Sequence, residues 1–315
     1  MRKIFILLLL AGCPWRSVFS QYWQQQVNYT IDVTLNDKDN SLDAFEKIEY
    51  TNNSPDTLHF IWFHLWPNAY KNDRTAYTDQ SLSLGDTRFY FSSREQKGYI
   101  NRLDFQVNNI TCNTEDHPLY IDIVKVILPS PLAPGQKIVV TSPFHVQLPF
   151  NFSRGGCDGE SYQVTQWYPK PAVYDKNGWH PMPYLEQGEY YGDFGKFDVR
   201  VTVPKNYVVA ATGELQNNEE KDWLLTRSSF SWKPVKHKTK GKGGIVKTMV
   251  VKYPPSSREV KTLRFMQDSI HDFVWFADKR FIVDHDTCHL ASGRRIDVFT
   301  YYTPQREEAW KNAIE

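Results

Sequence analysis

The stretch at residues 285–289 reads HDTCH, one letter from the zinc-binding pentapeptide HExxH. In HExxH the two histidines lie one helical turn apart, so both reach one zinc ion while the glutamate acts on its bound water. Here Asp286 is one methylene shorter than that glutamate, and residues 281–283 (FIV) favour a strand. We therefore expect a strand without a metal, and keep the metal site as a competing hypothesis. That site would consist of His285, Cys288 and His289.

Other catalytic patterns are absent from the sequence. It contains no G-x-S-x-G elbow, no P-loop and no G-x-G-x-x-G fingerprint. His59 and His64 are five positions apart in an apolar strand, an odd offset, so they should point to opposite faces. The residues alone therefore predict no complete catalytic site.

Composition limits the classes of function. A net charge of +1 gives no electrostatic reason to expect a nucleic-acid partner. Aromatic residues make up 15% of the 315 residues, as is typical of strand-rich proteins that contact peptides or carbohydrates. Beyond the amino-terminal segment there are three cysteines, Cys112, Cys157 and Cys288, which allow at most one disulfide.

The amino-terminal segment predicts export. A basic MRK start is followed by an apolar run at residues 4–10 that is too short to span a bilayer. Cleavage after Ser20 would remove residues 1–20 as a signal peptide, whereas LAGC at residues 10–13 would allow acylation of Cys13 and anchoring to a membrane. We expect ordinary cleavage and a periplasmic, cell-envelope or extracellular location.

The rest of the chain has the pattern of short strands. YTIDVTLN alternates apolar Ile31, Val33 and Leu35 with polar neighbours, as in a half-buried strand. Many such runs separated by Gly and Pro turns predict an all-β sandwich. The other candidate strands are AFEKIEYTN, TLHFIWFHLWP, RLDFQVNN, LYIDIVKVILP, QKIVVTSPFHVQLP, FDVRVTVP, YVVAAT, SSFSWKPV, IVKTMVVKYP and RRIDVFTYYTP.

Four segments need separate treatment. Residues 68–102 are polar and irregular, and the lysine-rich residues 233–244 are expected to form a solvated hairpin loop. Residues 261–280 suit a helix by spacing and a strand by composition, so both remain open. Residues 303–315 begin like a helix, with Thr303 as cap and proline next. We expect the chain to be cut within that helix.

Three longer segments resemble a known family. They are FHLWPNAYKNDRTA (63–76), residues 165–215, which begin TQWYPKPAVYDKNGWHPMPY, and IHDFVWFADKRFIVDHDT (270–287). Together they resemble the amino-terminal part of aminopeptidase N-like (leukotriene-hydrolase type) zinc metallopeptidases, in particular their large exported bacterial members.

The resemblance implies a saddle-shaped β-sandwich at residues 21–292, followed at 293–315 by the first strand and helix of a truncated thermolysin-like catalytic domain. In that family HExxH and the zinc ligands belong to the second domain, so this chain should bind no zinc and be inactive alone. Whether it is itself an enzyme is open; its parent would hydrolyse peptides at their N-termini through a zinc-activated water.

The resemblance also implies two substrate-binding residues. In the family, a glutamine and an acidic or amide residue two positions later face the cleft, and the second holds the free amine of the peptide. The matching residues are Gln166 and Tyr168, so the second position carries a phenol in place of a charge. The alternative function is a non-catalytic, exported, β-rich module that binds peptide or glycan.

Overall fold

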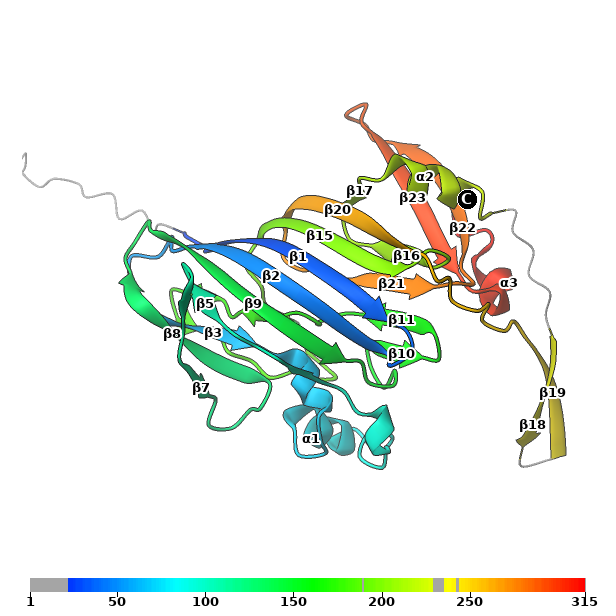
Figure 1. Cartoon of the computed structure of the whole chain (residues 1–315), viewed down its shortest axis with the longest axis horizontal. Helices are drawn as coiled ribbons and strands as arrows, with labels where there is room; N and C mark the ends of the chain where they lie inside the picture. Colours follow the sequence, from blue (N-terminus) through cyan, green and yellow to red (C-terminus); the bar gives the residue numbers. More distant parts are fainter. Residues whose placement is uncertain (1–21, 189, 229–234, 242–243, 315) are drawn as a thin grey trace, which may run out of the picture.

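A nine-stranded sheet dominates the computed structural model (Figure 1), which describes residues 22–188, 190–228, 235–241 and 244–314, without the side chains of 235–250. In order across the sheet lie β17 (Glu214–Leu215), β20 (Val260–Ile270), β15 (Gly195–Pro204), β1 (Gln26–Asn36), β2 (Ser41–Thr51), β9 (Lys137–Gln147), β5 (Gln106–Val107) and β6 (Ile110–Thr111), with β4 (Tyr99–Asn101) also paired to β9. β1 pairs in parallel with β15 and antiparallel with β2.

Two four-stranded sheets accompany the large one. The first has the order β10 (Gly156–Asp158), β11 (Ser161–Val164), β21 (Trp275–Asp278) and β16 (Val208–Ala211); the second has β12 (Lys170–Pro171), β3 (Leu58–His64), β8 (Ile123–Leu132) and β7 (Thr114–Asp116). Three pairs complete the strands: β13 (Tyr174–Asp175) with β14 (Gly178–Trp179), β18 (Val235–Gly241) with β19 (Gly244–Val250), and β22 (Ile282–His289) with β23 (Arg295–Tyr302).

Helices in the described residues are short, so the expected all-β class is confirmed. They are α1 (Ala76–Ser83), α2 (Asn218–Leu225), α3 (Glu307–Trp310) and the 3-10 turns η1 (Trp66–Tyr70), η2 (Arg94–Gln96) and η3 (Pro304–Arg306). Across the described ranges, no helix combines the length and the apolar character needed to cross a bilayer.

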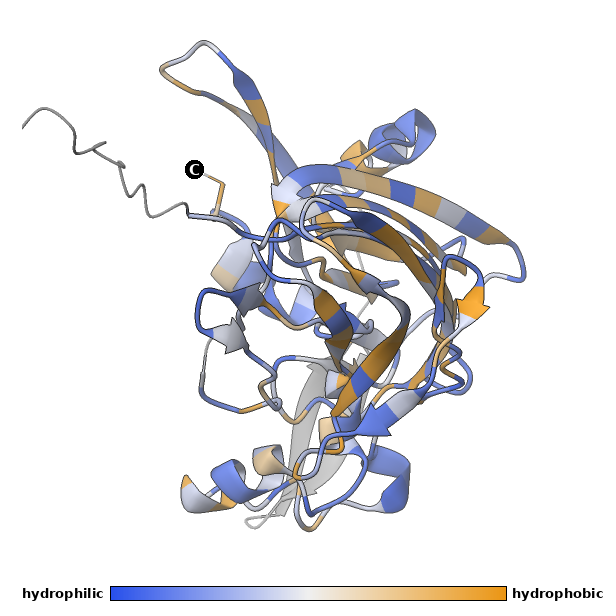
Figure 2. Cartoon of the chain, turned by 90° about the vertical axis from the view of Figure 1, so that its left-hand side faces the viewer, coloured by the Kyte–Doolittle hydropathy of each residue, from blue (hydrophilic) through white to orange (hydrophobic). Residues whose placement is uncertain are grey.

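The alternating strands build the core. Ile31 and Val33 of β1 are at most 1% exposed, as the sequence pattern predicted, and Figure 2 shows hydrophobic and hydrophilic residues alternating along the large sheet. The main apolar cluster joins side chains of this sheet to those of β3, β8, β11 and β21. The core therefore lies between the large sheet and the two smaller ones. The prediction that His59 and His64 face opposite sides of β3 is also confirmed, because only His64 is buried.

Several local predictions need correction. Most of the undecided residues 261–280 are strands, since they form the greater part of β20 and all of β21, with a connection at 271–274. Most of RLDFQVNN (102–109) is not a strand, because Arg102, Asn108 and Asn109 have positive φ, which breaks extended backbone.

The two remaining segments with unusual composition also differ from expectation. Residues 68–102 contain the end of η1, all of α1 and η2, and the short strand β4. The expected loop at 233–244 is shorter, since 235–241 form β18, and SSFSWKPV lies largely outside the described residues.

The carboxy-terminal helix is also different from expectation. Residues 304–306 form a 3-10 turn and only 307–310 are α-helical. Thr303 precedes the turn, but its side chain makes no capping hydrogen bond. β22 pairs with β23, so the expected domain boundary at 292/293 falls in the turn of one hairpin.

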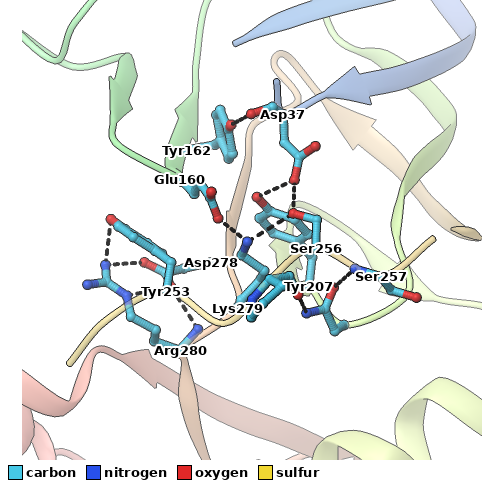
Figure 3. A network of polar contacts seen from close by, with 12 residues as sticks. Asp37, Glu160, Tyr162, Tyr207, Tyr253, Ser256, Ser257, Asp278, Lys279 and Arg280 are labelled. Carbon is cyan, nitrogen blue, oxygen red and sulfur yellow. Dashed lines mark hydrogen bonds and ion pairs between the residues drawn. The ribbon is translucent and has the colours of Figure 1, made fainter. Parts of the chain in front are cut away.

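A polar network fixes the segment that follows β19 to three parts of the fold (Figure 3). The Lys279 ammonium donates to the Ser256 hydroxyl at 2.9 Å and pairs with Glu160 in the turn between β10 and β11. Ser256 in turn donates to Asp37, in the turn between β1 and β2. Tyr207 donates to the same carboxylate at 3.0 Å.

Candidate functional site

The two residues expected to bind substrate lie in the connection between β11 and β12. Gln166 is half-buried and has a φ of +53°, a left-handed conformation that side chains other than glycine adopt rarely. Tyr168 is 2% exposed. Residues held in such conformations cost about 1–3 kcal/mol each and cluster at functional sites. The backbone at Gln166 therefore marks this connection as a candidate site.

One carboxylate brings the two residues together. Gln166 donates from Nε2 to Oδ2 of Asp272 at 2.6 Å, and the Tyr168 hydroxyl donates to Oδ1 at 2.8 Å. The backbone N–H of Phe273 also donates to Oδ1, at 2.8 Å. Asp272 lies between β20 and β21, about one hundred residues along the chain from its partners.

Asp272 was not found from the sequence. Asp272 lies in the segment IHDFVWF (270–276). The only sign of its role in the sequence is that one aspartate stands among largely apolar residues. Such an aspartate needs partners when the segment is buried. The identity of those partners depends on a tertiary contact that no local pattern encodes.

A buried lysine lies beside this carboxylate. The side chain of Lys170 is 3% exposed, donates to the carbonyl of His271 at 2.6 Å and lies 3.7 Å from Asp272 Oδ1. Burial lowers the pKa of Lys170, and the charge of Asp272 opposes that shift. The cation therefore offsets part of the negative charge of Asp272, while its hydrogen bond goes to the carbonyl of His271.

Two further buried acids surround Tyr29, whose ring lies edge-on to Tyr168. Burial raises the pKa of Asp193 to about 7, and burial also raises the pKa of Glu46. Burial is the main cause of the raised pKa of Tyr29, to which the carboxyl groups of Glu46, Asp193 and Asp272 add. The candidate site is therefore joined to an acid-rich layer in the core.

An open acceptor remains at the site. The Gln166 Oε1 and Thr165 Oγ1 atoms are buried and have no hydrogen-bond partner among the residues that the structure describes. Both residues line a cavity of about 20 Å³. A cavity of this size holds one small polar molecule or group, such as a water. Buried acceptors without partners are unfavourable, so this pair fits a hydrogen-bond donor supplied from outside the chain.

The HDTCH stretch is part of strand β22, as its sequence neighbourhood predicted. In a strand, His285 and His289 share a face but lie about 13 Å apart, and Cys288 points to the other face. His285 Nε2 lies 3.2 Å from Asp297 on β23. These residues therefore do not fit a zinc ion, and in the described part of the chain no three His, Cys, Asp or Glu residues form a metal-binding group.

Comparisons with known proteins give a distant likeness. No family model and no curated protein matches the chain. It is similar to solved structures of an M1 zinc metallopeptidase from Deinococcus radiodurans: a mutant form at 14% identity and a TM-score of 0.48, covering 89% of this chain and 48% of that one, and a mutant bound to a Tyr-Ser-Ala substrate at 13% identity and a TM-score of 0.47, with the same coverage.

The chain thus spans about half the length of these structures.

Proposed function

We propose that this chain is the amino-terminal β domain of an exported zinc metallopeptidase of the aminopeptidase class, and that Gln166 receives the amino group of a peptide. The three family-like sequence segments support the class. One structural observation supports the site: Gln166 is held in a left-handed conformation while its Oε1 has no partner among the described residues.

The chemistry of a peptide amino terminus suits this acceptor. An ammonium group only donates hydrogen bonds, and it is costly to bury without acceptors. Gln166 Oε1 offers one acceptor, and the Tyr168 hydroxyl keeps lone pairs while it donates to Asp272. We therefore place both residues that the resemblance indicated, Gln166 and Tyr168, in the proposed site. Gln166 is the one that contacts the amino group directly.

His285, Cys288 and His289 lie along strand β22 in an arrangement that does not fit a zinc ion. We propose that the metal ligands lie outside these 315 residues, so that this chain contributes binding and orientation. No catalytic step is assigned to its side chains. Peptides are the proposed substrates.

Aminopeptidase assays test this proposal. The 315-residue chain should show no chelator-sensitive release of amino-acid anilides, whereas a chain extended by what its gene encodes after codon 315 should show it. In the extended chain Gln166→Ala should raise KM about tenfold, the effect of one lost hydrogen bond to a charged group. Gln216→Ala, at an exposed glutamine, is the control. Chelator-sensitive activity of the short chain, or an unchanged KM in Q166A, would contradict the proposal.

Export is part of the same proposal and concerns residues outside the described range. The mass of the mature protein decides between its two routes. A chain that begins at Gln21 indicates cleavage after Ser20, and a lipid on Cys13 indicates anchoring. A cytoplasmic chain that keeps Met1 would contradict both.

A cavity of about 510 Å³ favours the alternative function, a binding module. His117, which lines it, accepts hydrogen bonds at Nδ1 from the backbone of Leu119 and Tyr120 and stacks on the Tyr120 ring. Peptide or oligosaccharide binding that is lost in His117→Ala and kept in Gln166→Ala would favour this function. The reverse pattern would favour the amine site.

A further inference from the structure

We infer that Asp272 is a positioning residue: it holds the amide group of Gln166 so that Oε1, and not Nε2, faces the ligand. This inference rests on the proposed function for its ligand, the amino group of a peptide. It depends on this chain's own contacts, since no sequence pattern pointed to Asp272.

The chemistry of the partners fixes the orientation of the amide. A glutamine amide has a donor end and an acceptor end, and these are distinguished by their hydrogen-bond partners. An ionised carboxylate only accepts hydrogen bonds. Asp272 Oδ2 therefore pairs with Nε2 of Gln166, at 2.6 Å, and Oε1 must point away from it.

Asp272 is itself fixed. Its Oδ1 accepts from the Tyr168 hydroxyl and from the N–H of Phe273, both at 2.8 Å. The two oxygens thus have different partners, and turning the carboxylate out of this plane would break all three hydrogen bonds. This arrangement makes Gln166, Tyr168 and Asp272 one rigid unit.

The same unit explains how tyrosine can occupy the position where the resembled family carries an acid or amide. The Tyr168 hydroxyl brings no charge, but it donates directly to the carboxylate of Asp272. The Asp272 side chain is 18% exposed, and Lys170 at 3.7 Å offsets part of its charge. Negative charge therefore reaches this site from a different segment of the chain.

The substitution Asp272→Asn separates positioning from a purely structural role. The asparagine introduced can accept at one end only, where Tyr168 and Phe273 donate. Its NH₂ group would then face Gln166, whose amide must turn over and use Oε1 to accept from it. The acceptor proposed for the ligand would be lost while the local shape stays the same. Asp272→Glu keeps an acceptor-only group and should preserve the orientation.

The experiment is NMR on the 315-residue chain with ¹⁵N-labelled glutamine, in which Q166A identifies the Gln166 side-chain resonances. The probe is L-alaninamide, and N-acetyl-alaninamide, whose amine is blocked, is the matched ligand. We expect saturable shifts of the Gln166 amide with the first ligand only. D272N should weaken this binding about tenfold or more, and D272E should keep most of it. Asp268→Asn is the control variant, because Asp268 is exposed and accepts from its neighbour Ser269.

Each outcome decides the inference. If D272N binds L-alaninamide with the wild-type affinity, or if its Gln166 NH₂ resonance is unchanged, the positioning role of Asp272 is overturned. This holds even if Q166A abolishes binding, a result that supports the amine site by itself. If the wild-type chain does not bind L-alaninamide, the proposed amine site is contradicted. A changed Gln166 NH₂ resonance in D272N would then still support the role of Asp272 in orienting Gln166. Should D272N not fold, the wild-type spectrum decides. One downfield, slowly exchanging Gln166 NH₂ proton supports a carboxylate partner, and freely exchanging NH₂ protons contradict it.

Discussion

Glu46 is an acid in the apolar interior of the large sheet. It is 1% exposed, and neither carboxyl oxygen has a hydrogen-bond partner in the described part of the chain. An ionised carboxylate in such a place would be very unfavourable, so the side chain is expected to be neutral in the folded protein. The direction of its pKa agrees, since burial raises the pKa of Glu46 well above its ordinary value.

The protonation of Glu46 should therefore make the free energy of unfolding fall as the pH rises. A carboxyl group whose pKa is raised in the folded state binds more protons there than in the unfolded chain. Its favourable contribution to the free energy of unfolding is complete below the unfolded pKa, near 4.5, and is lost as the pH rises towards the folded pKa. The slope is about 1.4 kcal/mol per pH unit in that window. We expect Glu46→Gln to flatten this slope, which urea unfolding between about pH 5 and pH 8 would measure. Asp43→Asn, at an exposed acid of the same strand, is the control. An unchanged slope in E46Q would show that Glu46 ionises freely.

The sequence held part of this information. In AFEKIEYTN the period of two that predicted the strand also places Glu46 on the same face as Ile48 and Tyr50, both buried. Burial of Glu46 could thus have been inferred from its register. The left-handed backbone of Gln166 and its contact with Asp272 could not, because they arise where two distant connections meet.

At the scale of elements, strand patterns were predicted well and their ends poorly. β1 and β15 followed their alternating residues, and the apolar run at residues 58–64 formed β3. Most of the undecided residues 261–280 became β20 and β21 because pairing with β15 and β11 satisfied their backbone. Tertiary pairing overrode a helical spacing that was equally present in the sequence.

The Lys279 network is an element-scale contact, since it fastens residues 251–259 to the turns of two hairpins (Figure 3). The Lys279 side chain is fully buried and Glu160 is 36% exposed. Loss of one partner of a buried pair is strongly destabilising. We expect Lys279→Met to lower the free energy of unfolding by about 2–3 kcal/mol, less than for a wholly buried pair because Glu160 reaches solvent.

Two variants control this prediction, both measured by urea unfolding. Lys205→Met breaks an exposed ion pair with Glu259 and should leave the unfolding midpoint unchanged. The double change K279M with Glu160→Gln removes both charges and should recover part of the loss. If K279M and K205M behave alike, the network does not hold the segment.

At the scale of the whole molecule, the core is unevenly distributed. The large sheet and the two four-stranded sheets share one apolar cluster. The β22–β23 hairpin instead contacts a small cluster formed with Val208 and Leu224, and most residues of both strands are exposed or half-buried. Figure 1 shows this hairpin beside α2, apart from the middle of the large sheet.

This distribution predicts unequal local stability. Regions with few buried apolar contacts open at a lower free energy than core strands. We expect the amides of β23 to exchange with solvent about a hundredfold faster than those of β1, β2 and β9, which corresponds to an opening free energy lower by about 2.7 kcal/mol. Hydrogen exchange with peptide-level mass spectrometry measures both at once, and the chain is its own control. Limited proteolysis should cut first near Ser292 and Gly293 in the turn, leaving the three-sheet core intact. Equal protection of β1 and β23 would mean that the hairpin and the core unfold as one cooperative unit, against the uneven core described here.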